Sequence, residues 1–431
     1  MRKMKDSGVE WIGQIPSDWD VSKIKYLIKS PLQYGANESG IDYDERLPRY
    51  IRITDITMDN ELKEDGKLSL DNTTAKPYLL KDEDILFARS GASVGKTFFY
   101  RKIFGASAFA GYLIRASLNK KVAYPKFVFY NTLGLNYENW KNQSFSQATI
   151  QNIGADKYNE YILPIPPITE QQKIADFLDE KCGEIDSIRS DVQREIEILN
   201  DYKKSVITEA VTKGLNPKAK LKDSGIEWIG KIPEGWDSIK AKYLFKQRNS
   251  KGNTIDLQLL SPSQKFGVIP QSKLEELTTQ KVVKLNEKVN LAELKTIHQG
   301  DFCISLRSFQ GGFEYSEYEG VVSPAYQVFY SIVSCCNGYY RYLFKEKSFI
   351  EKMNSFTMSL RDGKNIAFED FANSEMPVPP LSEQKAIADY LDEKCSEINA
   401  TIADKQRQLE TLDEYKKSLI FEYVTGKKEV S

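Results

Sequence analysis

An internal repeat constrains the fold of this chain more than any other feature of its sequence. Residues 5–19 read Lys-Asp-Ser-Gly-Val-Glu-Trp-Ile-Gly-Gln-Ile-Pro-Ser-Asp-Trp, and this segment returns with few changes at 222–236. Residues 164–212 return without a gap at 377–425, whereas the sequences between the repeated segments barely match. Near-identical segments on either side of divergent ones predict a structural unit that occurs twice. In this unit a common framework would present two different globular domains.

Composition places the chain among globular proteins of two or three domains. It has 431 residues, of which 41% are apolar, enough to build cores. No apolar run approaches the roughly 18 residues of a membrane span, and the N-terminus leads into no signal-like hydrophobic region. The odd number of cysteines and the lack of a Cys-x-x-Cys pair favour reduced thiols in a cytoplasmic protein over disulfides or a zinc site. The cysteines are Cys182, Cys303, Cys335, Cys336 and Cys395.

The net charge of −1 conceals a separation of charge along the chain. The globular stretches carry a small excess of basic residues, and the segments 169–218 and 381–431 carry an excess of acidic ones. So weak a positive charge would not hold a polyanion by itself. A DNA-binding role would therefore need basic residues presented locally, or a basic partner.

Each of the later repeated segments predicts a long helix that begins just after prolines. Thr169 and Ser382 are the expected N-caps, and Glu170 and Glu383 follow in the first turn, where the helix dipole favours acid. Apolar residues then recur seven apart over about five heptads. In the first copy, the first column comprises Leu178, Ile185, Val192, Leu199 and Val206. The second column comprises Ile174, Ile188 and Tyr202. In the second copy, the first column comprises Leu391, Ile398, Leu412 and Leu419, and the second comprises Ile387 and Tyr415.

The two helices are expected to pack on each other as an antiparallel coiled coil. A helix of about 44 residues is roughly 66 Å long, more than its own small domain can cover. Some seam positions are polar, which indicates an imperfect seam or a face that docks a partner. These positions are Lys181, Lys394, Glu195 and Lys405.

The repeated motifs resemble those of the specificity subunit of type I restriction–modification systems. Residues 166–181 read Pro-Pro-Ile-Thr-Glu-Gln-Gln-Lys-Ile-Ala-Asp-Phe-Leu-Asp-Glu-Lys, and 379–394 repeat the pattern. Tyr-Lys-Lys-Ser follows at 202–205 and at 415–418, and Trp-Ile-Gly-x-Ile-Pro opens the copies at 11–16 and 228–233. The resemblance covers the whole architecture.

This resemblance implies an α+β fold with a pseudo-two-fold tandem repeat. Two mixed α/β target recognition domains, at 1–168 and 218–380, would be joined by two long antiparallel coiled-coil helices, the conserved spacers at 169–217 and 381–431. Each recognition domain would read one half of a bipartite site in double-stranded DNA, and the spacers would set the gap between the halves. A pseudo-two-fold protein can present two readers to neighbouring grooves on one face of DNA.

The resemblance also implies that the chain is not an enzyme and holds no cofactor or metal. Two methyltransferase (modification) subunits would dock on the framework, and restriction–translocase subunits would join them. Adenine N6 methylation from S-adenosylmethionine and cleavage driven by ATP and Mg²⁺ would take place in those partner subunits.

A glycine-rich loop follows the expected strand at 84–87 and reads Arg-Ser-Gly-Ala-Ser-Val-Gly-Lys-Thr from 89 to 97. Glycines allow close backbone approach, and Arg, Lys and hydroxyl groups suit phosphates and guanine edges. We therefore predict DNA contacts from Arg89, Ser90, Lys96 and Thr97. A structural hairpin is an alternative, and so is a nucleotide-binding P-loop, although the glycine spacing is one residue short of that motif.

The corresponding loop of the second copy predicts contacts from Arg307 and Gln310. Its arginine lies six residues after Asp301, whereas Arg89 lies five after Asp84. A shift of one residue turns a strand side chain to the other face unless a bulge absorbs it. The two domains are therefore expected to read different bases, which would make the DNA site asymmetric.

A second polar loop ends each globular domain. It contributes Gln147 and Gln151 in the first copy, and Arg361 and Lys364 in the second. Gln can pair with adenine, and Arg or Lys with guanine. Between the loops, Tyr112 and Tyr326 are expected in the core, with a DNA-facing position as the alternative.

Other aromatic and titratable residues have simpler expected places. His298 is expected in a surface turn, and the tryptophans of the opening segments are expected to anchor packing. Those tryptophans are Trp11, Trp19, Trp228 and Trp236.

Two other classes of function remain open at this point. The chain could be a DNA-binding scaffold with its own nuclease or NTPase activity, or a coiled-coil scaffold with no DNA role. No methyltransferase motif, Gly-x-Gly-x-x-Gly loop or His/Cys cluster is found in the sequence.

Overall fold

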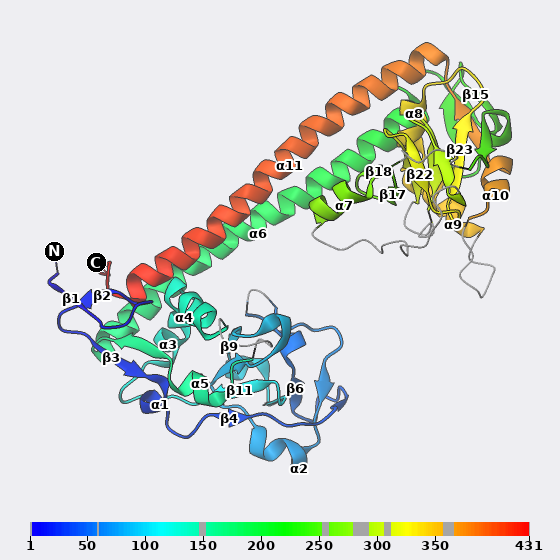
Figure 1. The fold of residues 1–431 in the computed structure, drawn as a ribbon. Coiled ribbons are helices and arrows are strands. Elements are labelled where there is room, and N and C mark those ends of the chain that lie inside the picture. The colour runs from blue at the N-terminus through cyan, green and yellow to red at the C-terminus, as the bar shows by residue number, and fades with distance from the viewer. Residues whose placement is uncertain are drawn as a thin grey trace. The chain divides into compact units, whose positions relative to one another are not determined.

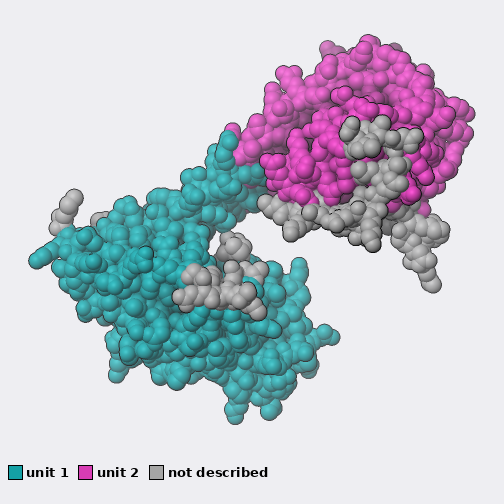
Figure 2. Space-filling view, in the orientation of Figure 1, with its two compact units in different colours: residues 1–193, 406–431 teal, residues 194–405 magenta. Residues whose placement is uncertain are grey.

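A computed structural model describes residues 2–57, 60–145, 152–251, 258–278, 293–305, 312–356 and 366–430. The chain divides into two compact units. Unit 1 comprises residues 1–193 and 406–431, and unit 2 comprises residues 194–405 (Figure 2). Each unit holds one globular domain together with parts of both long helices, so unit 1 combines two separate stretches of sequence whereas unit 2 is one continuous stretch.

The two long helices are α6 (Ile168–Lys213) and α11 (Leu381–Val424) (Figure 1). The carbonyl of Pro167 accepts hydrogen bonds from the backbone N–H groups of Glu170 and Gln171, at 2.8 and 3.0 Å. The carbonyl of Pro380 does the same at the start of α11. The predicted N-caps Thr169 and Ser382 are therefore wrong, because each lies inside the first turn. A proline can precede the helix in this way because its missing N–H would have had no helical partner.

Within unit 1, the first half of α6 packs antiparallel to the last part of α11. Leu178 and Ile185 share a buried core with Leu419 and Ile420. The ammonium of Lys416 lies 2.6 Å from the carboxylate of Asp186, and Asp413 pairs with Arg189 at 2.7 Å. The predicted antiparallel seam is therefore confirmed in this unit.

Within unit 2, the second half of α6 packs on the first half of α11 in the same manner. Val206 lies in one core with Ile387 and Leu391. The two polar seam positions Glu195 and Lys405 form an ion pair of 2.5 Å. These two polar seam residues thus pair across the seam, whereas Lys181 and Lys394 pair with Glu184 and Glu397 of their own helices.

The second apolar column agrees with the prediction near the helix starts, where Ile174 and Ile387 are 2% and 0% exposed, and departs from it further along both helices. Ile188, Tyr202 and Tyr415 are 50%, 48% and 56% exposed, so their placement in the seam is wrong. Where a helix has only one neighbour it buries a single stripe, so these three residues of the adjoining column stay on the surface.

The opening segments form matching hairpins beside the helix ends. They comprise β1 (Met4–Asp6) with β2 (Gln14–Pro16), and β13 (Leu221–Asp223) with β14 (Lys231–Pro233). Trp19 and Trp236 follow these hairpins and are 1% and 0% exposed. Their indole N–H groups donate to Glu170 and Glu383 at 3.0 and 2.9 Å. The prediction of tryptophan anchors is confirmed, and the first-turn acids have a second role as their acceptors.

The globular domain of unit 1 is built on an antiparallel sheet of order β4-β11-β8-β9. Helices from both ends of the domain share one core with this sheet. The strands are β4 (Gln33–Tyr34), β8 (Ile85–Ala88), β9 (Thr97–Phe99) and β11 (Leu113–Ala116). The helices are α1 (Ile24–Leu27), α3 (Pro125–Asn131), α4 (Leu135–Phe145) and α5 (Ala155–Asn159).

A second sheet of order β10-β6-β7-β5 extends the first domain, and the pair β3–β12 joins its two ends. The strands of the second sheet are β5 (Ile41–Asp42), β6 (Arg49–Ile51), β7 (Leu68–Ser69) and β10 (Ser107–Phe109), with the short helix α2 (Asn72–Ala75) after β7. The joining pair is β3 (Asp20–Lys23) and β12 (Ile162–Ile165), which leads directly into α6.

The globular domain of unit 2 has the same central sheet, in the order β16-β23-β20-β21. Its strands are β16 (Phe245–Arg248), β20 (Phe302–Ile304), β21 (Phe313–Tyr315) and β23 (Gln327–Ser331). The joining pair β15 (Asp237–Lys240) and β24 (Glu375–Val378) also returns, as do three helices. These helices are α8 (Asn337–Leu343), α9 (Lys347–Ser355) and α10 (Phe368–Asn373).

Outside the central sheet the two domains differ. Unit 2 has two small pairs in place of the second sheet, and a helix α7 (Gln271–Thr278). The pairs are β17 (Leu260–Ser263) with β18 (Gly267–Pro270), and β19 (Lys295–Ile297) with β22 (Gly320–Val322). The shared framework therefore reaches further into the globular domains than the sequence repeat does.

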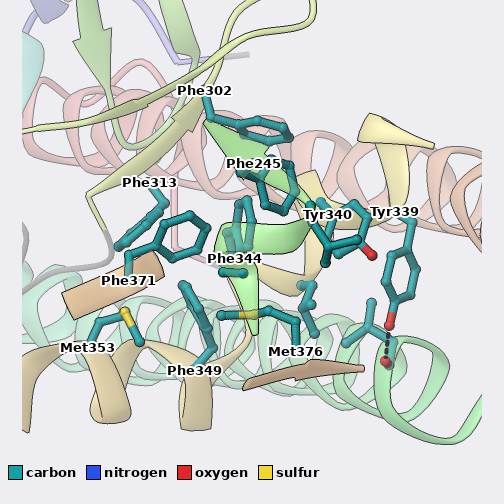
Figure 3. Close-up of a cluster of buried hydrophobic side chains, with 14 of the residues drawn as sticks. Phe245, Phe302, Phe313, Tyr339, Tyr340, Phe344, Phe349, Met353, Phe371 and Met376 are labelled. Atoms are coloured by element: carbon teal, nitrogen blue, oxygen red, sulfur yellow. Dashed lines mark hydrogen bonds between the residues drawn. The ribbon is translucent and has the colours of Figure 1, made fainter. Parts of the chain in front are cut away.

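Aromatic packing fixes the central sheet of unit 2 (Figure 3). Rings from strands and helices surround Phe245 at centroid distances of 5.1 to 5.9 Å, and they belong to Phe302, Phe329, Tyr340, Phe344 and Phe371. Tyr339 reaches from the same cluster to α6, where its hydroxyl donates to the carbonyl of Val211 at 2.8 Å. The core thus joins the sheet to the helix pair within one unit. Among the described residues, no helix is long and apolar enough to cross a membrane.

Candidate nucleic-acid interface

The two polar loops predicted in the first domain meet where β8 ends. The backbone N–H of Arg89 donates to the carbonyl of Tyr112 at 3.0 Å, and its carbonyl accepts from the N–H of Ile153 at 2.8 Å. Ser90 forms an isolated antiparallel bridge with Asn152. Gln147 and Gln151 lie outside the described residues, but the segment they precede is bonded directly to Arg89.

The side chain of Arg89 packs on an aromatic ring and, among the described residues, has no hydrogen-bond or ion-pair partner. Its guanidinium carbon lies 5.0 Å from the centre of the Tyr34 ring. Its Nε atom is buried without a hydrogen-bond partner. Tyr34 is itself fixed, because its hydroxyl accepts a hydrogen bond of 2.9 Å from the N–H of Ala155. The arginine is therefore held in place, and its side chain forms no hydrogen bond or ion pair with the other described residues.

Arg89 differs in this respect from the other described arginines of residues 1–168. Each of those forms a hydrogen bond or an ion pair through its side chain. They are Arg2, Arg46, Arg49, Arg52, Arg101 and Arg115. A buried donor without a partner costs free energy, so such a group in a well-packed domain suggests that a ligand completes it.

The end of the glycine-rich loop serves the packing of the domain. The hydroxyl of Thr97 lies 2.8 Å from that of Thr132, and Thr97 is 3% exposed. The prediction that Thr97 contacts DNA is wrong, because all three residues of β9 are buried and none faces solvent. The ammonium of Lys96 donates to the carbonyl of Ile56 at 2.9 Å, which favours a structural role over a P-loop.

In the second domain, the predicted site residues Arg307, Gln310, Arg361 and Lys364 lie outside the described residues. Described residues that flank both loops lie beside β20 and β23 of the central sheet. Ser305 donates its N–H to the carbonyl of Gly312 at 2.7 Å across the first loop. Gln327, the partner of Ile304 in the sheet, bonds to the carbonyl of Ile366 at 3.0 Å, where the second loop ends.

Three further predictions concern residues near these loops. Tyr112 is 61% exposed, so its expected core position is wrong. Tyr326 packs partly buried against a core cluster, as predicted. The ring of His298 is 44% exposed and lies 2.7 Å from Glu319, which agrees with a surface turn.

The partnership of Arg89 with Tyr34 was not predicted from the sequence. The two residues lie far apart in the chain and meet only because β11 pairs with both β4 and β8. A lone tyrosine after a short strand gives no signal by itself.

Two copies of one sheet, each carrying a pair of divergent polar loops and seated on shared helices, define a tandem recognition protein. The family model described as "Type I restriction modification DNA specificity domain" matches the chain twice, over residues 16–197 and 233–411. The chain belongs to this type I restriction–modification DNA specificity family. It is the recognition component of such a system and not the catalytic one.

Similar proteins agree with this assignment over the whole chain. The MjaVIII specificity subunit of a type I restriction enzyme from Methanocaldococcus jannaschii is 24% identical over 96% of this chain and 94% of its own. The putative MjaX specificity subunit of the same organism is 25% identical over 96% and 95%. The predicted type I specificity subunit is therefore confirmed, and the nuclease or NTPase alternative has no support in these matches.

A solved structure shares the fold. It comes from work on complex assembly and conformational transition of the type I restriction–modification system. It aligns with a TM-score of 0.68 and 14% identity, over 96% of this chain and 99% of its own. The likeness confirms the predicted tandem α+β architecture.

Proposed function

We propose that each globular domain reads one half of an asymmetric bipartite site in double-stranded DNA. The observation that carries this proposal is that, in both domains, the described residues flanking two polar loops lie beside equivalent strands of the same four-stranded sheet. The loops differ in sequence: the first copy offers Arg89 and two glutamines, and the second offers arginines, Lys364 and Gln310. Different donors at equivalent places would select different bases.

The long helices would set the gap between the half-sites and dock the modification subunits. Tyr202 and Tyr415 occupy equivalent positions of the repeat, and both are about half exposed, at 48% and 56%. Exposed tyrosines at repeated positions suit two copies of one partner, because aromatic side chains often anchor protein interfaces. One such anchor per unit fits two methyltransferase subunits.

The chemistry would belong to the partners of this chain. Methyltransferase subunits would use S-adenosylmethionine to methylate adenine, and restriction–translocase subunits would use ATP and Mg²⁺. Such an enzyme must take its target base out of the stack, so it needs DNA held in register nearby. The reduced cysteines and the DNA substrate favour a cytoplasmic location.

Mapping methylated adenines in cells tests this function. The chain would be expressed together with its modification subunits, and modified positions would be found by sequencing of genomic DNA. We expect one asymmetric bipartite motif that disappears when this chain is omitted. A motif that persists without the chain, or a symmetric motif in its presence, would contradict the proposal.

A further inference from the structure

We propose that Arg89, packed on Tyr34, reads a guanine in the half-site of the first domain. This inference rests on the proposed function and names the base and the residue. Guanine presents O6 and N7 side by side in the major groove, and the planar fork of an arginine can bond to both at once.

The first argument is that the backbone of Arg89 is fixed on both sides. Its N–H is bonded to the carbonyl of Tyr112, just before β11, at 3.0 Å, and its carbonyl to the N–H of Ile153, just after the second polar loop, at 2.8 Å. Arg89 directly follows β8, whose last residue, Ala88, pairs with Leu113 of β11. The backbone position of Arg89 is therefore fixed as firmly as the strands of the central sheet.

The second argument is that Tyr34 restricts the side chain as well. The ring lies 5.0 Å from the guanidinium carbon, and it is anchored by strand pairing with Ile114 and by the bond from Ala155. A guanidinium already held over an aromatic ring loses less conformational entropy when it binds DNA. This favours a contact in which the guanidinium must align with two acceptors at once. Tyr34 is in this view a positioning residue.

The third argument is that nothing in the described part of the domain competes for the fork. By comparison, the guanidinium of Arg115 in β11 donates hydrogen bonds to the carbonyl of Leu79, at 2.8 Å, and to the side chain of Gln33. Arg89 forms no such bond, and its Nε is buried without a partner. Next to it, Gly91 has a φ of +75° and open space where a side chain would begin, which leaves room for DNA to approach.

A phosphate contact is the competing outcome, because arginine also binds phosphate. A phosphate contact would add affinity on every sequence, and a lysine could replace the arginine as a point charge. A lysine can donate to a guanine as a point charge, but it lacks the planar fork that bonds to O6 and N7 together, so Arg89→Lys should recover only a small part of the guanine-dependent affinity that Arg89→Ala loses. The lysine variant also retains much of the side-chain volume, which keeps the test valid if the alanine variant folds poorly.

The experiment uses the complete chain assembled with its modification subunits and a duplex that carries the methylated motif. Each guanine in the half-site of the first domain is replaced in turn by 7-deazaguanine, which lacks the N7 acceptor. We expect one such position to lower the affinity of the wild-type complex on the order of 10- to 100-fold. The Arg89→Ala complex should be weakened on the normal duplex and insensitive to deazaguanine at that position, and the Arg89→Lys complex should remain much closer to Arg89→Ala than to the wild type in both respects.

Controls separate the possible outcomes. Arg46→Ala removes an 87% exposed arginine of the same unit that already pairs with Asp44, and it should change neither affinity nor motif. Tyr34→Phe keeps the ring and should retain guanine selectivity, whereas Tyr34→Ala should reduce it.

Two results would overturn the inference. The first is an unchanged motif with Arg89→Ala. The second is a uniform loss of affinity on all duplexes that Arg89→Lys restores, which would assign a phosphate contact. If the wild-type complex methylates no motif at all, the proposed function fails instead.

Discussion

A buried carboxylate in the second domain makes the stability of that unit depend on pH. Glu314 lies on β21 and is 1% exposed. One of its oxygens accepts a hydrogen bond of 2.7 Å from the ammonium of Lys345, and the other is buried without a partner. Burial outweighs the attraction of Lys345 and raises the pKa of Glu314 from 4.5 to about 7.

The sign of the effect follows because Glu314 binds its proton more tightly in the folded state than in the unfolded chain. The folded state holds the Glu314 proton up to a pH of about 7, whereas the unfolded chain releases it near 4.5. Below pH 4.5 both states are protonated and the group costs nothing. Between pH 4.5 and about 7 the unfolded state becomes ionised first, so the stability of the folded state falls as pH rises. A shift of this size corresponds to about 3 kcal/mol at pH 8.

Replacing Glu314 by Gln should remove this dependence, because the amide has nearly the same shape and does not ionise. We expect Glu314→Gln and the wild type to be similarly stable near pH 4.5. At pH 8 the variant should be more stable by about 3 kcal/mol, or roughly 6–12 °C in the thermal transition of unit 2.

Calorimetry over this pH range, together with hydrogen exchange of the β20 and β21 amides, measures the difference. The control is Glu351→Gln, since Glu351 is 65% exposed in a loose ion pair and should show no such trend. A stability difference that is constant with pH, or that favours the wild type at pH 8, would refute the reasoning.

Three further predictions concern the framework. Replacing Tyr202 and Tyr415 by Ala should leave the helix pair folded but weaken binding of modification subunits on the order of 10-fold per site, as measured by sedimentation; unchanged assembly would contradict a docking role. A permuted chain that opens near Asn216, with its present ends joined, should still direct methylation, because Lys427 after α11 already donates to two carbonyls of the first opening segment, at 2.8 and 3.2 Å. A permuted chain that folds yet supports no methylation would refute that arrangement. Residues 1–217 alone should dimerise and direct methylation to a palindrome, since each copy would supply the helix end that unit 1 otherwise takes from α11; a monomer by light scattering, or a non-palindromic mark, would count against this.

The helical framework was predictable because its pattern is repeated and periodic. The first apolar column is buried as expected, with Leu178 at 0%, Ile185 at 5% and Val192 at 8% exposure. The second column failed at Ile188 and Tyr202 because a heptad pattern does not state how many helices surround it. An apolar residue beside the seam has the same spacing whether it meets a third helix or solvent.

The recognition domains were predictable only in part. The two loops were identified from their composition, and in the first domain their described ends do meet. Thr97 was misplaced because a strand buried on both faces shows no alternation of polar and apolar residues. Tyr34 was missed because its partner Arg89 is reached only through strand pairing, which no local pattern encodes.

Contacts at the starts of the two long helices explain how the helical framework can stay constant while the globular domains vary. In unit 1, the side chain of Gln171 accepts from the backbone N–H of Tyr124 at 2.7 Å. In unit 2, the equivalent Gln384 accepts from the backbone N–H of Cys336 at 2.9 Å. Each glutamine thus holds its globular domain through backbone atoms, which every residue except proline can supply. The side chains of the held segment are free to change without releasing the domain from the helix, so selection for new DNA sequences can alter the readers while the framework stays constant.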